Sequence, residues 1–296
     1  MEFFAVYLNL FSVSLAQGAV YAFVALGVMI PFRLLSLPDL TSEGTFPLGG
    51  AVLATLLASG FNPVMGLMAA ILAGILAGGA TALIHLFLRV PSLLAGIIVL
   101  TMLFSINIRI MGKPNTAIFN FDTIFTELLN ADGGAPLSQF AVLMVIILLV
   151  CGLLYWFLHT EIGVALRSVG ANQMMSRAQG MPTHWYIIGG LGLAGALSAL
   201  GGAIMAQFQS YADVTMGAGV LIIGLAATIL GEALVGNKTL VRQIAAPVVG
   251  ALIYFQVVAV ALALGMKPSD LRLLTGLFVI CTLAAPLIAQ RLVRMR

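Results

Sequence analysis

The sequence predicts an all-α, polytopic integral membrane protein with about nine spans. Of its 296 residues, 61% are hydrophobic and only 8% are charged, and the mean hydropathy is +1.14. A soluble domain carries roughly 25% charged residues, so this composition cannot form a water-facing surface of normal area. In addition, apolar stretches long enough to cross roughly 30 Å of hydrocarbon recur along the chain.

Seven stretches are long enough to cross the membrane, and two shorter ones follow polar breaks. The long stretches are 6–33, 63–88, 92–111, 137–158, 182–209, 240–263 and 271–292. The short ones are 45–59 and 218–235. Together they form a single transmembrane domain over residues 1–296. The first three residues lack the basic region of a cleavable signal, so we expect the first span to stay in the mature protein.

The distribution of Lys and Arg predicts the orientation, because cytoplasmic loops carry an excess of both. With residues 159–182 in the cytosol, nine basic residues fall inside: Arg33, Arg89, Arg167, Arg177, Lys238, Arg242, Arg291, Arg294 and Arg296. Four fall outside: Arg109, Lys113, Lys267 and Arg272. We therefore predict an extracytosolic N-terminus and a cytosolic C-terminus. The outer loop 112–136 is predicted to include a short amphipathic helix over 121–129.

Residues 159–182 form a polar segment in an otherwise apolar region. Aromatic residues typical of a membrane–water interface flank it: Tyr155, Trp156, Trp185 and Tyr186. Apolar residues recur within it at helical spacing: Ile162, Leu166 and Val169. We predict a short amphipathic helix that lies flat at the surface and ends near Gly170. A second turn over 172–180 follows, and Pro182 opens the next span. An ordinary loop with water-facing charges is the alternative.

Two polar breaks resemble each other. Residues 38–44 (PDLTSEG) match residues 212–217 (ADVTMG) at an offset of 174 residues (213 minus 39). At the same offset, glycines pair with glycines: Gly27 with Gly201, and Gly50 with Gly224. The predicted threading puts Asp39 on the cytosolic side and Asp213 on the opposite side. This pattern is expected of an inverted repeat whose interrupted helices meet at a solute path, with halves of roughly 1–135 and 160–296. Chance similarity between short apolar strings is the alternative.

Polar residues within or beside spans are costly and usually face a cavity or a partner. Seven are candidates for lining a path: Asp39, Thr41, Glu43, Asn107, Asp213, Thr215 and Glu232. For the two Asp-x-Thr pairs, helix capping by either side chain is the competing role. For Glu232, the competing role is a carboxylate that reaches the cytosolic interface beside Lys238. Asn107 is the favoured path residue, because an amide in a span needs partners and can offer hydrogen bonds to a solute.

The sequence indicates neither nucleotide binding nor catalysis. Residues 231–239 (GEALVGNKT) resemble a phosphate-binding loop, but Asn237 separates the glycine from the lysine and no strand precedes the segment. His, Cys and carboxylate residues lack metal-ligand spacing, and no nucleophile–base pair is recognisable. We therefore expect no enzymatic activity, cofactor or metal in this chain. The net charge of +3 reflects topology rather than nucleic-acid binding.

Several motifs resemble a known family. Residues 161–172 (EIGVALRSVGAN) and 178–181 (AQGM) are similar to the cytosolic coupling segment of bacterial ABC-importer permeases of the branched-chain amino acid and ribose type. The break at 37–41, followed by Gly49 and Gly50, is similar to the other motif of that family. The motifs PDLT-x-x-G-x-F-P-L-G and SIN-x-RIMG-x-PN, at 38–49 and 105–115, resemble the tryptophan/tyrosine-type uptake subgroup. The resemblance covers nearly the whole chain.

The resemblance implies a multi-pass permease of the bacterial cytoplasmic (inner) membrane that carries a small solute. The subgroup suggests an amino acid, with aromatic amino acids as the suggested type. The implied partners of the permease are a second permease copy, two ATP-binding cassette ATPase subunits that hold ATP and Mg, and an extracytosolic solute-binding protein. ATP would drive alternating access through the permease dimer. The residues expected to contact the ATPase are Glu161, Gly163, Arg167, Gly170, Ala171, Asn172, Gln179 and Gly180. The pair Thr41 and Glu43 departs from the plain branched-chain pattern, which argues against leucine-type solutes.

An ion-coupled secondary transporter is the alternative function. It would use Asp39, Glu43 or Glu232 as its titrating group. A non-transporting membrane anchor is a third hypothesis, but it does not explain the paired polar breaks.

Overall fold

The computed structural model describes residues 2–129 and 135–267, together with 270, 273, 275–277 and 280. Within these residues the protein is helical apart from one two-stranded ribbon. In the part of the chain that the structure describes, seven helices are long and apolar enough to cross a membrane: Leu10–Leu34, Pro63–Leu88, Ser92–Met111, Pro136–His159, Thr183–Gln209, Val214–Val235 and Leu240–Ala263. The prediction of an all-α polytopic membrane protein is therefore confirmed.

These spans correspond to six of the long predicted stretches and to the short stretch 218–235. The other short stretch is α2 (Ser42–Ala58), whose 17 residues give a helix about 26 Å long at 1.5 Å per residue. This length is slightly less than the hydrocarbon thickness, which explains why α2 is not among the seven spans. The predicted stretch 271–292 lies largely outside the described residues.

The elements follow one another in a simple order. After α1 (Glu2–Met29) the chain forms η1 (Ile30–Leu34), α2, α3 (Pro63–Leu88), α4 (Ser92–Met111), β1 (Asn115–Ala117) and α5 (Ile124–Leu129). The second part contains α6 (Pro136–His159), α7 (Glu161–Ala171), α8 (Gln173–Ala178), α9 (Thr183–Gln209), β2 (Tyr211–Asp213), η2 (Val214–Gly217), α10 (Val220–Val235) and α11 (Leu240–Ala263). The predicted outer helix over 121–129 is α5, which begins three residues later.

Helices α1 and α9 form the centre of the bundle. In their most apolar windows, 78% of the residues of the α1 span and 83% of those of α9 are buried, against 22% for α6. Small residues permit this close packing. A Cβ on Gly195 of α9 would lie only 2.2 Å from the carbonyl oxygen of Gly74 in α3. The other long helices surround this centre and expose large apolar side chains, as expected in lipid.

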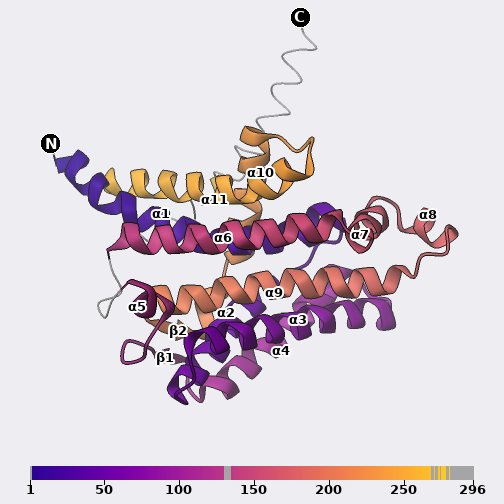
Figure 1. The fold of residues 1–296 in the computed structure, drawn as a ribbon, viewed down its shortest axis with the longest axis horizontal. Helices are drawn as coiled ribbons and strands as arrows, with labels where there is room; N and C mark the ends of the chain where they lie inside the picture. The colour runs from indigo at the N-terminus through magenta and orange to yellow at the C-terminus, as the bar shows by residue number, and fades with distance from the viewer. Residues whose placement is uncertain are drawn as a thin grey trace, which may run out of the picture.

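The two ends of the bundle differ. Helices α7 and α8 lie at one end, whereas α5 and the β1–β2 ribbon lie at the other (Figure 1). The ribbon is antiparallel and pairs Asn115 with Asp213, and Ala117 with Tyr211. It therefore fixes the loop after α4 to the connection between α9 and α10.

Contacts around α1 and α9 are reciprocal. Helix α9 packs on α2 and α3, and α1 packs on α10 and α11. Gly27 of α1 lies against Ser198 of α9, and Gly201 of α9 lies against Val24 of α1. The two contacts exchange under the offset seen in the sequence, because 27 plus 174 is 201 and 198 minus 174 is 24. The segments that resemble each other in sequence thus make equivalent contacts.

Candidate functional site

The predicted short helices at 159–182 are present as α7 and α8. The Thr160 hydroxyl caps α7 by accepting from the backbone N–H of Gly163 at 3.3 Å. The Asn172 side-chain oxygen caps α8 by accepting from the N–H of Met175 at 3.0 Å. Each short helix therefore begins at a side chain that satisfies an otherwise free backbone donor.

The predicted apolar face of α7 is only partly buried within the protein. Leu166 and Val169 are buried, but Ile162 is 58% exposed. The inward face is centred instead on Gly163, Leu166 and Gly170, because the two glycines allow the backbone of α7 to approach its neighbours closely. This rotation moves Ile162 to the edge of the helix, where water or a partner can reach it.

The close approaches at the two glycines of α7 are made within the chain. A Cβ on Gly163 would lie 2.4 Å from the carbonyl oxygen of Phe157, and one on Gly170 would lie 1.7 Å from that of Leu34. Gly163 therefore fits α7 against the end of α6, and Gly170 fits it against η1. Any movement of α7 would press directly on the end of the α1–η1 segment.

Hydrogen bonds hold α7 and α8 to the neighbouring spans. The guanidinium of Arg167 donates to the carbonyl oxygen of Leu158 at 3.1 Å. Nε of Arg177 donates to the Thr183 hydroxyl at 3.0 Å, and the hydroxyls of Ser168 and Ser176 lie 3.3 Å apart. Arg167 is half-buried, and its hydrogen bond to Leu158 attaches α7 to the end of α6. The two helices thus form a braced element between α6 and α9.

The outer surface of this element is unusually apolar for a polar segment. The side chains of Ile162, Val164, Met174 and Met175 are exposed by 58%, 50%, 83% and 60%. Five predicted coupling residues are also exposed around them: Glu161, Ala171, Asn172, Gln179 and Gly180. The other three, Gly163, Arg167 and Gly170, face inward as described above. We call the four exposed apolar side chains the α7–α8 patch.

The two Asp-x-Thr breaks form the same turn. The Asp39 carboxylate accepts from the backbone N–H and the hydroxyl of Thr41 at 2.9 and 2.5 Å. The Asp213 carboxylate accepts from the same two groups of Thr215 at 2.7 and 2.5 Å. The aspartate is the acceptor in both breaks, but only Asp213 caps a helix, the short η2, whereas α2 begins after Thr41 without a side-chain cap. These local hydrogen bonds account for both aspartates without a solute.

The environments of the two aspartates differ, although both lie in connections outside the seven spans. Asp39 is 2% exposed, and burial raises the pKa of its carboxyl above the usual value despite the hydrogen bonds from Thr41. Asp213 is partly exposed. Its partial burial raises the pKa, but hydrogen bonds from Thr215 and Asn115 outweigh this and hold it below the usual value. Burial, rather than the motif, decides which aspartate binds a proton more readily.

Three further candidates join elements to one another. The Glu43 carboxylate faces the backbone N–H of Gly219, and so links the start of α2 to the start of α10. Asn107 is fully buried and donates to the carbonyl oxygen of Gly44 at 3.4 Å. Glu232 forms an ion pair with Arg33 rather than lying beside Lys238, which corrects the predicted partner. The fold brings Arg33 close because η1 ends next to the last turn of α10.

Comparison with known proteins identifies the family. A family model described as branched-chain amino acid transport system / permease component matches residues 10–283. The tyrosine transport system permease protein of Clostridioides difficile (strain R20291) is 35% identical over 270 residues, which cover 91% of this chain and 89% of that relative. The ribose import permease protein RbsC of Escherichia coli (strain K12) is 28% identical over 251 residues, covering 83% and 75%. No solved structure matches the chain.

The chain belongs to this permease family. It is the permease component of an ABC-type uptake system, a transport subunit rather than an enzyme. The resemblance seen in the sequence motifs is thereby confirmed, and the relatives are bacterial.

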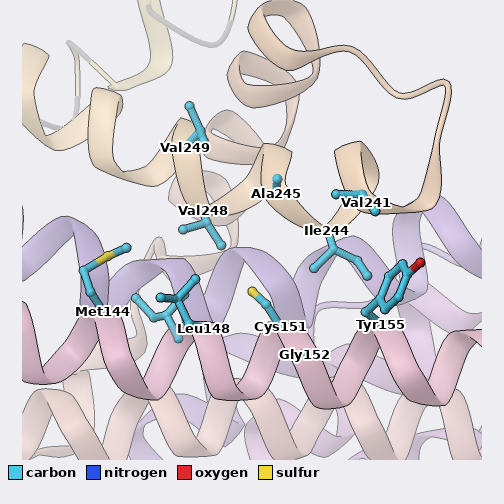
Figure 2. Close-up of a pocket in the computed structure, with 11 residues that line it drawn as sticks. Met144, Leu148, Cys151, Gly152, Tyr155, Val241, Ile244, Ala245, Val248 and Val249 are labelled. Carbon is cyan, nitrogen blue, oxygen red and sulfur yellow. The ribbon is translucent and has the colours of Figure 1, made fainter.

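The permease contains cavities of different character. Figure 2 shows a groove of about 480 Å³ between α6 and α11, lined by apolar side chains such as Leu148, Ile244 and Val248. A second cavity, of about 400 Å³, lies between α1, α10 and α11 and includes Gln17, Tyr21 and Tyr254 in its lining. An outer pocket of about 410 Å³ is lined by Asn115, Tyr211, Asp213, Thr215 and Met216. Two predicted path residues, Asp213 and Thr215, therefore face open space.

Gln17 and Tyr21 were not among the residues predicted to line a path. The sequence does carry a signal for them: two polar side chains four residues apart, on one helical face, within the first apolar stretch. Asn107 was preferred because it is an amide within a span, but it is fully buried, whereas Gln17, also an amide within a span, lines a cavity.

Proposed function

We propose that this permease is the membrane subunit of a binding-protein-dependent ABC importer for an aromatic amino acid. It works as a homodimer in the bacterial cytoplasmic membrane, with two ATPase subunits that carry ATP and Mg on the cytosolic face. An extracytosolic binding protein delivers the solute. The observation that carries the proposal is the family match over residues 10–283 together with a braced, exposed α7–α8 element at one end.

The α7–α8 patch supports docking of an ATPase. Apolar side chains surrounded by polar ones are typical of protein interfaces, and such exposure would be costly in water without a partner. Gly170 places α7 directly against Leu34, so a force that an ATPase applies to the patch is transmitted to the end of the α1–η1 segment. Closure of the ATPases would then tilt the spans and alternate access across the dimer.

The reciprocal contacts support an inverted repeat, with the N-terminus outside and the C-terminus inside, and about nine spans. The break after α1 begins beside α7, because Gly170 faces Leu34 and Leu35. The break after α9 begins at the opposite end, in the β1–β2 ribbon (Figure 1). Two equivalent interrupted helices that start from opposite ends match the architecture expected of alternating access. The positive charge near α7 favours this end as the cytosolic one.

The names of the relatives support an amino acid as the solute. The Clostridioides difficile relative is named a tyrosine permease, and it shares more identity with this chain than the ribose permease does. The Thr41 and Glu43 pair, which departs from the plain branched-chain pattern, is compatible with an aromatic solute rather than leucine.

An ion-coupled transporter fits the carboxylates less well. Asp39 is hydrogen-bonded by Thr41, Glu43 faces the N–H of Gly219, and Glu232 pairs with Arg33. Each therefore already has a partner that stabilises its position in the fold. The presence of these three carboxylates is therefore explained without ion binding or release.

Reconstitution tests the proposed function. The permease is purified from native membranes with its partners and placed in liposomes, and ATP hydrolysis and tyrosine uptake are measured with and without solute-loaded binding protein. We expect stimulated hydrolysis and uptake that requires ATP. Uptake by the permease alone that collapses when ionophores dissipate the proton and sodium gradients would instead support ion coupling.

A further inference from the structure

We infer that the cavity between α1, α10 and α11 binds the aromatic amino acid during its passage. The inference rests on the proposed function and assigns it a site. Its volume of about 400 Å³ falls within the range of roughly 300–1,000 Å³ typical of small-molecule sites. The proposal is carried by two independent features: unpartnered polar side chains and a cluster of aromatic rings.

Gln17 and Tyr21 supply the polar groups. Both line the cavity from one face of α1, and neither side chain has a hydrogen-bond partner among the residues that the structure describes. They lie 7 and 11 residues into the span that begins at Leu10, at about 10 and 17 Å along its axis. Unpaired amide and hydroxyl groups at this depth are costly in an apolar environment. A solute with its own donors and acceptors would remove that cost.

Aromatic rings form one wall of the cavity. The Tyr21 ring lies 4.8 Å from that of Phe255, and Phe255 lies 5.2 Å from Tyr254 in an edge-to-face arrangement. Tyr21 also stacks on Phe46 at 5.8 Å, which fixes its orientation from behind. Centroid distances of 4.5–7 Å are those that favour ring–ring attraction. The wall therefore suits a planar aromatic side chain better than a branched aliphatic one or a sugar.

The start of α10 faces the same cavity. Gly219, Ile222 and Ile223 contribute to its lining, and the Glu43 carboxylate already faces the N–H of Gly219. The dipole of α10 favours negative charge at this position, and Glu43 supplies it. The polar contacts to the solute therefore come from Gln17 and Tyr21, while its ring packs on Tyr21 and Phe255. The site thus offers polar groups and aromatic rings to the same solute.

The apolar groove in Figure 2 offers no such combination. Its lining on α6 and α11 is apolar apart from the Cys151 thiol and the Tyr155 hydroxyl. A zwitterion placed there would lose the hydration of two charges without a polar replacement. The cavity lined by Gln17 is therefore the better candidate for an amino-acid site, because its lining includes both polar groups and aromatic rings.

Thiol protection tests the site without relying on transport. Gln17→Cys is introduced into the full chain in a background with Cys151→Ala and Cys281→Ala, and its alkylation is followed in the reconstituted complex. We expect tyrosine or phenylalanine at saturation to slow alkylation at least about fivefold, and leucine and ribose to leave the rate unchanged. Equal rates with and without aromatic amino acids, or equal protection by leucine, would overturn the proposed site.

Uptake selectivity provides a second measurement with a matched pair. Loss of one hydrogen bond to a solute lowers efficiency by about tenfold, so Gln17→Leu and Tyr21→Phe should reduce tyrosine uptake by up to that factor. Tyr7→Phe also removes a single hydroxyl from α1, but this hydroxyl binds Gln256 outside the cavity, so uptake should change less than twofold. Stimulated ATP hydrolysis in the unsubstituted complex separates the two claims. If hydrolysis and tyrosine uptake are normal but the cavity variants behave like Tyr7→Phe, the site is wrong and the importer function stands.

Discussion

Arg33 pairs with Glu232, and this ion pair joins η1 to the end of α10 across 199 residues of sequence. The arginine side chain is 49% exposed, whereas the glutamate side chain is only 12% exposed. Arg33 is next to Leu34, whose carbonyl oxygen faces Gly170 of α7. The pair therefore joins η1, which packs against α7 of the proposed coupling element, to the end of α10 in the second half of the chain.

The unequal burial of this pair predicts unequal losses of stability. Arg33→Leu leaves a mostly buried carboxylate without its cation and should cost about 1–3 kcal/mol. Glu232→Leu leaves a half-exposed guanidinium that water can solvate, and it should cost less than about 1 kcal/mol. Thermal unfolding of the purified permease in detergent measures the difference. Equal shifts in Tm for the two variants would contradict the described burial.

The contact between Gly170 and Leu34 predicts that a single methyl group displaces α7. Gly170→Ala should lower stability by about 1–3 kcal/mol, because overpacking forces the backbone to move. Gly189→Ala is the control, since a Cβ there meets nothing within 4 Å. The two variants are compared by thermal unfolding and by copurification of the ATPase. Wild-type behaviour of Gly170→Ala would show that α7 is not tightly packed on η1.

The α7–α8 patch should matter for coupling but not for folding. Ile162→Asp and Met174→Asp change exposed side chains, so the purified permease should unfold within a few degrees of the wild type. Stimulated ATP hydrolysis should fall by about 30-fold or more if these side chains are central to the interface. Leu128→Asp on α5 is a matched control, because it is 63% exposed at the opposite end. Normal hydrolysis in both patch variants would remove the patch from the coupling surface.

The two aspartates should respond oppositely to pH. Burial raises the pKa of Asp39 in the folded protein, so its stabilising contribution is complete below the unfolded value of about 3.8 and is lost as pH rises through the folded pKa. Asp39→Asn, which keeps an acceptor oxygen, should therefore gain stability relative to wild type as pH rises from 4 to about 8. For Asp213 the pKa is lowered, so its contribution is present above about 3.8 and is lost on acidification.

Asp213→Asn should consequently lose stability relative to wild type at neutral pH, and the loss should shrink in acid. Tm values measured as a function of pH for the wild type and both variants give the comparison. Parallel curves for Asp39→Asn and the wild type would mean that Asp39 does not titrate differently in the folded state.

The proposed orientation predicts one-sided labelling. Asn172 is exposed between α7 and α8, and Asn120 is exposed in the connection that leads to α5. In a background without Cys151 and Cys281, Asn172→Cys should react with an impermeant thiol reagent only from the cytosolic side. Asn120→Cys should react only from outside. The reverse pattern would invert the topology and place the patch away from the ATPases.

Much of the architecture could be predicted from local sequence. Hydrophobic length predicted all seven candidate spans of the described residues, six as long stretches and one as the short stretch 218–235. The capping residues Thr160 and Asn172 lie where the predicted surface helices begin. These features depend on residues that are neighbours along the chain. Ile162 shows the limit of this approach. Its spacing places it on the apolar face with Leu166 and Val169, but the close approaches at Gly163 and Gly170 turn that face so that Ile162 stays exposed.

The candidate path depended more on tertiary contacts. Asp39 and Asp213 share a motif and a hydrogen-bond pattern, yet only the fold buries one of them. Asn107 was predicted to line the path because it is an amide in a span. In the structure it is fully buried and donates a hydrogen bond to the carbonyl oxygen of Gly44. Gln17 was overlooked, although it and Tyr21 are polar, lie four residues apart and share a helical face; that this face borders a cavity depends on the tertiary packing of α10 and α11.

By itself, the sequence determined that this protein lies in a membrane as a bundle of helices with a short polar element between two spans. Hydrophobic length, capping side chains and charge distribution are sufficient for that, since each acts within a few residues or one span. Only the tertiary structure decided that Arg33 meets Glu232 and that Gln17 shares a cavity with Tyr254. Those relationships join residues 199 and 237 positions apart (254 minus 17), and the packing of small residues between α1, α9 and their neighbours sets them.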